Sequence, residues 1–126
     1  MASNQNWINK MIWYSYLASS NVVQSQFVQL SSDGLSVELH TTGNALGLCM
    51  SVETTEDTQQ TIARVYVAGG SGQDAILHAA WSGEQTRFEV VSGKVNPISS
   101  GGVGWLIPAF PKTAYSENDV VKVSIY

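Results

Sequence analysis

Charged side chains are scarce in this sequence. They make up 13% of the 126 residues, about half the share found in an average soluble protein. Six basic residues stand against ten acidic ones and give a formal net charge of -4, whereas binding to a phosphate backbone needs a basic surface. Nucleic acid is therefore not an expected partner. A small surface with so few ions is expected to make extensive contacts with other protein.

Long apolar runs are also missing. The apolar stretches are short and interrupted, and none approaches the roughly 20 residues that a helix needs to cross a bilayer. The first six residues are mostly polar and carry no charged side chain, unlike the basic and apolar regions of a secretion signal. We expect neither a membrane partner nor secretion by the classical route.

Cysteine is represented once, by Cys49, so an intramolecular disulfide is excluded. A chain of this length can bury a hydrophobic core large enough for a stable fold without a disulfide cross-link. Cys49 lies in the apolar stretch of residues 45–50 and has no flanking cation that would lower its pKa. We predict a small buried side chain rather than a reactive thiol.

Short strands are present in abundance. From residue 21 onward, alternating apolar segments are separated by Gly, Ser, Asn and Asp clusters at intervals of roughly ten residues, which is typical of sandwiches and barrels. The pattern predicts an all-β fold: a β-sandwich or small barrel, jelly-roll-like, of about eight to ten short antiparallel strands. We expect residues 21–126 to form a single domain preceded by an N-terminal arm, residues 1–20.

The clearest predicted hairpin joins residues 22–30 to residues 35–40 through a turn that contains Gly34. Alternation in its second strand predicts one aliphatic and one polar face. The aliphatic face would hold Leu35, Val37 and Leu39, and the polar face Ser36, Glu38 and His40.

Three further features of the β pattern are predicted from turn chemistry and edge effects. Ser92 and Gly93 indicate a tight two-residue hairpin, and Pro97 beyond it should lie at a strand end or sheet edge. The glycine-rich residues 69–72 are expected to end the strand of residues 62–68. The apolar segment 119–126 should be a paired strand, since a free apolar edge invites aggregation.

Aromatic residues are concentrated in the N-terminal arm. Its apolar positions fit a short helical face at the start and a strand at residues 13–17, and periodicity does not decide between them. Buried aromatics dominate many interfaces, so the arm is expected to dock either on its own domain or on a neighbouring subunit. The candidate binding residues are Trp7, Ile8, Met11, Ile12, Trp13, Tyr14 and Tyr16.

No constellation of reactive residues is evident. His40 and His78 lack a second ligand at metal-binding spacing, and no Gly-x-Ser-x-Gly nucleophile motif occurs. The acidic segment of Glu53, Glu56 and Asp57 lacks the pattern of a calcium-binding loop and predicts a solvated turn. We therefore predict no catalytic residues, no metal, no cofactor and no enzymatic activity.

The tryptophans and tyrosines leave a second possibility open. Aromatic rings exposed on a β scaffold can stack on sugars while neighbouring polar side chains hydrogen-bond the hydroxyls. Trp81 and Trp105 are the candidates for such contacts. A carbohydrate-binding module, such as a lectin or a receptor-binding domain of a phage fibre, is the alternative function.

Residues 43–126 resemble the head-decoration, or capsid cement, proteins of tailed bacteriophages. The likeness is a succession of strand-forming segments: GNALGL (43–48), RVYVAG (64–69), SGKV (92–95), GWLI (104–107) and YSENDVVKV (115–123). It implies a noncatalytic virion protein on the capsid surface, assembled in the bacterial cytoplasm. The implied partners are the major capsid protein, whose neighbouring capsomers it would bridge, and further copies of itself in a dimer or trimer.

Overall fold

The computed structural model describes residues 10–107 and 114–126, and all of its regular elements there are β-strands. Their order in the sheet is β3-β2-β4-β5-β9-β8-β6-β7, with β1 also paired to β5. All ladders between these strands are antiparallel, so the predicted all-β fold of about eight to ten short antiparallel strands is confirmed. The strands are β1 (Ile12–Leu17), β2 (Phe27–Leu30), β3 (Val37–Leu39), β4 (Gly47–Thr54), β5 (Thr61–Ile76), β6 (Arg87–Val91), β7 (Lys94–Ile98), β8 (Gly104–Ile107) and β9 (Val120–Ile125).

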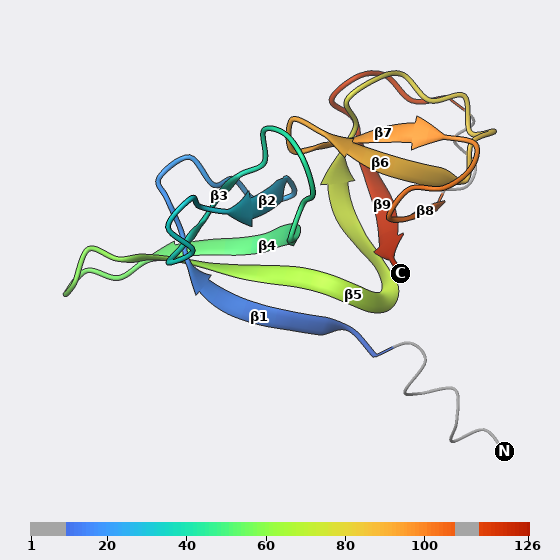
Figure 1. The fold of residues 1–126 in the computed structure, drawn as a ribbon. Helices are drawn as coiled ribbons and strands as arrows, with labels where there is room; N and C mark the ends of the chain where they lie inside the picture. Colours follow the sequence, from blue (N-terminus) through green and yellow to red (C-terminus); the bar gives the residue numbers. More distant parts are fainter. Residues whose placement is uncertain (1–9, 108–113) are drawn as a thin grey trace, which may run out of the picture.

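Strand β5 joins the two halves of the molecule. Its first half pairs with β1 and β4, and its second half pairs with β9. Figure 1 shows β5 curving sharply between a lobe that contains β1 to β4 and a lobe that contains β6 to β9. We call these groups of strands, each with its half of β5, the first sheet and the second sheet.

The expectation that residues 69–72 end a strand is wrong, because β5 continues through them for a total of 16 residues. The pairing register shifts between Gly69 and Gln73, so the extra residues form a bulge that bends the strand. Gly69 adopts a φ of +77°, which glycine reaches without steric cost. The Tyr66 hydroxyl fixes the bend by donating to Gly69 O and accepting from Ile125 N–H.

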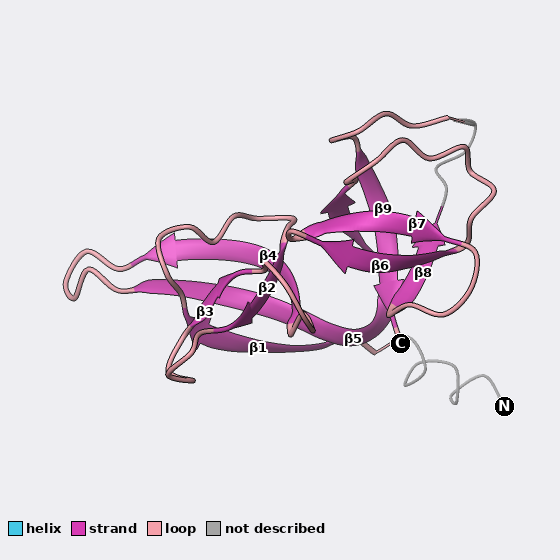
Figure 2. Ribbon diagram, turned by 45° about the horizontal axis from the view of Figure 1, so that its top comes forward, coloured by secondary structure: helices cyan, strands magenta, loops and turns pink. Residues whose placement is uncertain are grey.

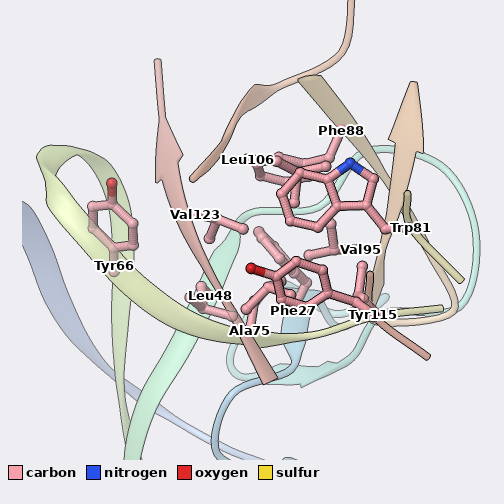
Figure 3. Packing of buried hydrophobic residues seen from close by; sticks show 12 residues of the cluster. Phe27, Leu48, Tyr66, Ala75, Trp81, Phe88, Val95, Leu106, Tyr115 and Val123 are labelled. Atoms are coloured by element: carbon pink, nitrogen blue, oxygen red, sulfur yellow. The ribbon is translucent and has the colours of Figure 1, made fainter. Parts of the chain in front are cut away.

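A larger hydrophobic core lies where the two sheets face each other. Phe27 and Leu48 from the first sheet meet Phe88 and Val123 from the second, and the Phe27 and Phe88 rings are 5.8 Å apart. Figure 3 shows these side chains converging on one another. Because this core includes residues from both sheets, it fixes the angle between the lobes.

A smaller core lies inside the first sheet, under β2 and β3. It comprises Val22, Val28, Val37, Cys49, Ala63 and Val65. The predicted burial of Cys49 is confirmed, and burial raises the pKa of its thiol. A parallel bridge between Ala18 and Val37 brings the chain just after β1 against β3, so this core is enclosed along that side.

The hairpin predictions are confirmed where local turn chemistry decides the outcome. Ser92 and Gly93 connect β6 to β7 with φ angles of 49° and 79°, the left-handed pair that a tight hairpin of this kind requires. Pro97 lies in β7, the last strand of the sheet path. The final strand, β9, is paired on both sides by β5 and β8.

The predicted faces of the second hairpin strand are only partly correct. Val37 is buried, but Leu35 precedes β3 and is 75% exposed. His40, expected on the polar face, is buried just beyond the strand. Its Nδ1 accepts from Gly93 N–H, and its Nε2 lies 2.9 Å from Gly43 O, so both ring nitrogens have backbone partners. This histidine therefore ties the loop between β3 and β4 to the turn between β6 and β7.

Candidate functional site

Strand β1 is the most apolar exposed element of the described structure. Four of its six side chains have exposed fractions between 43% and 55%: Ile12, Trp13, Tyr14 and Leu17. The strand contains no charged residue. Large apolar side chains gathered in this way on a small protein indicate an interaction surface.

The backbone of β1 is paired on one side. Ala18 N–H, just after the strand, donates to Thr61 O, and backbone groups alternate in direction along an antiparallel strand. The N–H and C=O groups of Trp13 and Ser15 therefore point away from β5. Among residues 10–107 and 114–126, no strand forms a ladder with this outer edge of β1, and β3 meets the chain only beyond its end, at the bridge of Ala18 to Val37. An open strand edge is a template for pairing with another extended chain.

The side chains of β1 divide between its two faces. Tyr14 and Tyr16 share one face, where their rings meet edge to face at 6.4 Å. Tyr16 also packs against the smaller core. Trp13 lies on the other face, with the Arg64 guanidinium 5.5 Å from its ring. Both faces thus present aromatic rings beside the open edge.

The remaining candidates of the N-terminal arm have different positions. Met11 packs against the larger core, and Trp7 and Ile8 lie outside the described residues. The arm was expected to dock either on its own domain or on a neighbouring subunit. Its strand β1 docks on its own domain, where it is hydrogen-bonded to β5. It leaves Ile12, Trp13, Tyr14 and Leu17 available to a neighbour. The residues from 11 to 16 that sequence analysis grouped together therefore include both half-buried and exposed side chains.

The two tryptophans considered for sugar contact lie in different environments. Trp81 is 2% exposed and stacks on Tyr115 with ring centres 4.7 Å apart (Figure 3). Its indole N–H donates to Gln85 O at 3.0 Å. Trp81 is therefore a core residue and is not accessible to a sugar. Trp105 is 42% exposed and lies on the outer face of the second sheet.

Trp105 belongs to a cluster that sequence analysis did not assemble. The Arg87 guanidinium lies 4.1 Å from its ring centre and 5.6 Å from that of Tyr126. The two rings are perpendicular, with centres 5.5 Å apart. The contact arises because Arg87 and Trp105 are opposite each other in the β6 and β8 ladder. The alternation of each strand was evident in the sequence, but this pairing was not.

The described surface has shallow hollows near the loop of residues 43–45. One, of about 410 Å³, is lined by Gln29, Leu30, Thr42, Asn44, Ala45 and Leu46. A second, of about 350 Å³, includes Glu89, whose carboxylate accepts from Asn96 Nδ2 at 3.0 Å. No pair of ionisable side chains converges in either hollow, so neither offers the elements of acid–base catalysis.

Acidic side chains project from the far end of the first sheet. Glu53, Glu56 and Asp57 are exposed on and beside the loop between β4 and β5, which extends away from the rest of the molecule in Figure 2. Within the described ranges, no group of three or more His, Cys, Asp or Glu side chains is arranged to hold a metal ion. Those residues also contain no helix long and apolar enough to span a membrane.

Comparison with known proteins identifies a similar fold. No family model matches the chain, and no curated protein matches it. Among solved structures, the chain is similar to the N base of the head fiber gp8.5 of bacteriophage phi29. The TM-score is 0.58 at 14% sequence identity, and the likeness covers 93% of this chain and 95% of that one. At this identity the comparison establishes a shared fold over nearly the full length of both chains.

Proposed function

We propose that this chain is a noncatalytic structural protein of a tailed bacteriophage particle that attaches to the outer surface of the head. The observation that carries the proposal is the fold shared with a phage head fiber base over nearly all of both chains. The resemblance of residues 43–126 to head-decoration proteins supports the same assignment. Its location would be the virion, at the capsid surface, after assembly in the bacterial cytoplasm.

The attachment surface we assign is the exposed part of β1. Ile12, Trp13, Tyr14 and Leu17 supply apolar area, and the outward backbone groups of Trp13 and Ser15 supply hydrogen bonds to an incoming strand. Aromatic residues at the centre of an interface contribute most of its binding energy. A partner that extends the first sheet along β1 would bury these side chains and satisfy the open edge together.

The finer role that we propose is that of a cement protein. A protein that binds only the assembled, correctly spaced lattice stabilises that lattice by its binding free energy. Many copies, each a dimer or trimer that contacts neighbouring subunits of the major capsid protein, add their effects over the shell. The sparse charge of the chain suits a surface used for protein contacts.

The proposal assigns no reaction to the chain. His40 is committed to Gly93 N–H and the Gly43 carbonyl, and His78 follows β5 where its N–H donates to Val95 O. Burial of the Cys49 thiol raises its pKa, which disfavours the thiolate that a nucleophile needs. These geometries favour structural roles for the three residues.

The test uses heads of the source phage assembled without this protein. The double substitution Trp13→Ser with Tyr14→Ser should weaken binding to these heads by at least about 30-fold, as expected for the loss of two aromatic anchors. Leu35→Ser is the matched control, because Leu35 is also an exposed apolar residue but lies outside β1. Cosedimentation of each labelled protein with the heads gives the affinities.

Substitution is preferable to deletion here. Strand β1 is paired with β5 along its length, so removing it would expose Val65 and a second strand edge and would perturb folding. Equal head binding by the double variant and the wild type would refute β1 as the anchor. Failure of the wild-type protein to bind these heads at all would refute head attachment itself.

A further inference from the structure

The second sheet buries one face and exposes the other. Phe88, Leu106 and Val123 point into the larger core. The residues that alternate with them form a row across three strands, because Arg87 is opposite Trp105 and Trp105 is opposite Ser124. The outer face is therefore an accessible platform that contains the cluster of Arg87, Trp105 and Tyr126. We call this cluster the Arg87 platform.

Ring contacts orient the Arg87 guanidinium and leave its N–H groups available for hydrogen bonds. Its guanidinium contacts the rings of Trp105 and Tyr126. Within the described part of the chain, it makes no ion pair and no side-chain hydrogen bond. Glu89, two residues along the same face of β6, bonds to Asn96 instead. An arginine fork that is half-buried, oriented by two rings and unpaired matches a planar carboxylate.

We propose that the Arg87 platform binds a saccharide that carries a carboxylate, such as a uronic or sialic acid. The guanidinium receives the carboxylate in a bidentate pair, and the exposed part of the Trp105 ring stacks on the face of the pyranose. Tyr126, 52% exposed and perpendicular to Trp105, forms the side wall. Aromatic walls with one well-placed charged group are typical of small-molecule sites.

The composition of the platform favours a sugar over an acidic protein segment. Protein interfaces have an apolar, water-excluding centre. Here two polar pairs border the cluster: the Asn96–Glu89 hydrogen bond and the exposed ion pair between Lys122 and Asp74, 2.6 Å apart. The apolar patch suited to protein lies on β1, in the first sheet. A protein attached through β1 would keep a separate surface for a saccharide, so this inference is independent of the proposed function.

The test is a titration of the full ¹⁵N-labelled chain, followed by NMR, with sodium glucuronate, N-acetylneuraminate and glucose. We expect saturable shifts of the Trp105 indole N–H with either acidic sugar, with a Kd on the order of millimolar. Glucose lacks the carboxylate and should bind at least about 10-fold more weakly, since a hydrogen bond to a charged group contributes roughly 1.5–3 kcal/mol.

Matched variants separate the two parts of the site. Arg87→Gln should weaken glucuronate binding about 10-fold or more and remove the preference over glucose. Trp105→Ala should abolish binding of all three sugars. Trp13→Ala is the control, because it removes an exposed, arginine-contacted tryptophan at the other surface and should leave the affinity unchanged. The NMR spectrum of each variant verifies its fold.

Several results would overturn the inference. Equal affinity for glucose and glucuronate would show that the carboxylate is not recognised. Unchanged binding by Trp105→Ala would show that the sugars bind elsewhere. Shifts at the Arg87 platform with a glutamate-rich peptide, or on raising the protein concentration, without any response to acidic sugars would assign the platform to protein contacts instead.

Discussion

Trp81 and Trp105 illustrate how far a single residue type can be interpreted from sequence. Both tryptophans follow apolar residues in segments with strand character. Trp81 is buried because it forms a two-way backbone bridge with Tyr115, Trp81 N–H to Tyr115 O and Tyr115 N–H to Trp81 O. This bridge joins positions far apart in the chain, so local alternation carries no signal of it.

The contrast predicts different stabilities for two truncations. Trp81→Ala removes a buried ring stacked on Tyr115 and should reduce the free energy of unfolding by about 3–5 kcal/mol. Trp105→Ala removes a partly exposed ring from the surface and should cost about 1 kcal/mol or less. Urea denaturation followed by circular dichroism measures both values. Similar losses for the two variants would contradict the assigned burial.

The Cys49 thiol provides a pH-dependent prediction at the same scale. Burial raises its pKa above the ordinary value of about 9, so the folded state retains a proton that the unfolded state loses. Its contribution to stability is therefore full below pH 9 and decreases as the pH rises through and beyond that value.

The same burial predicts that the native thiol is protected from reagents. At pH 8, Ellman's reagent should react with Cys49 at the rate of unfolding, and within minutes once the protein is in guanidinium chloride. Absorbance at 412 nm follows the reaction. Stoichiometric reaction of the native protein within the mixing time would show that the thiol is accessible, contrary to the structure.

Among the elements, β5 shows why an element's limits are harder to predict than its existence. Alternation located the strand at residues 62–68, but the glycines that follow have the composition of a turn. The chain remains extended because β9 pairs with residues 73–76 beyond the bend. The Tyr66 hydroxyl also bonds to Gly69 O in β5 and to Ile125 N–H in β9. Those contacts are tertiary and have no local sequence signature.

The bend gives an element-scale prediction about Gly69. A Cβ at this position would lie 2.2 Å from Lys10 O, so Gly69→Ala must displace the backbone that leads into β1. Gly34→Ala is the matched control, because Gly34 has a similar φ of +73° but open space around its Cβ position. Both variants place a Cβ on a left-handed residue and are destabilised by that backbone strain. Only Gly69→Ala adds a steric clash.

We expect Gly69→Ala to be less stable than Gly34→Ala by roughly 1–3 kcal/mol, the usual range for overpacking against fixed structure. Hydrogen exchange should increase at Met11 and Ile12 in the Gly69 variant and remain unchanged there in the control. Equal stability and equal exchange for the two variants would mean that Lys10 does not pack against the bend.

The hairpins show which elements the sequence does determine. Ser92 and Gly93 were recognised because a two-residue turn needs left-handed residues, a purely local requirement. The faces of residues 35–40 were assigned by extending alternation beyond the three residues of β3. Leu35 and His40 lie on either side of that strand, so their burial is set by the loops around them rather than by strand period.

For the molecule as a whole, the pattern of short alternating segments predicted the fold class, and the aromatic residues of the arm indicated the region of the candidate site but not its arrangement. The aromatic arm marked the segment that became β1, yet only packing against the smaller core separates the half-buried Tyr16 from the exposed Tyr14 on the same face. Arg87 carried no signal at all, since its significance depends on lying opposite Trp105. Pairings between distant strands decide both surfaces.

The two surfaces differ in charge, and this predicts opposite responses to salt. Strand β1 has no charged residue, so the proposed head attachment through it should change by less than about 3-fold between 50 and 500 mM NaCl. Glucuronate binding at Arg87 depends on a partly exposed ion pair, which salt screens over a distance of about 10 Å at 0.1 M and 3 Å at 1 M. It should weaken several-fold over the same range. Cosedimentation with heads and NMR titration with glucuronate, on one protein preparation, measure the two salt dependences. Head binding that is lost at 500 mM NaCl would mean that ionic contacts, rather than the apolar side chains of β1, hold the protein on the capsid.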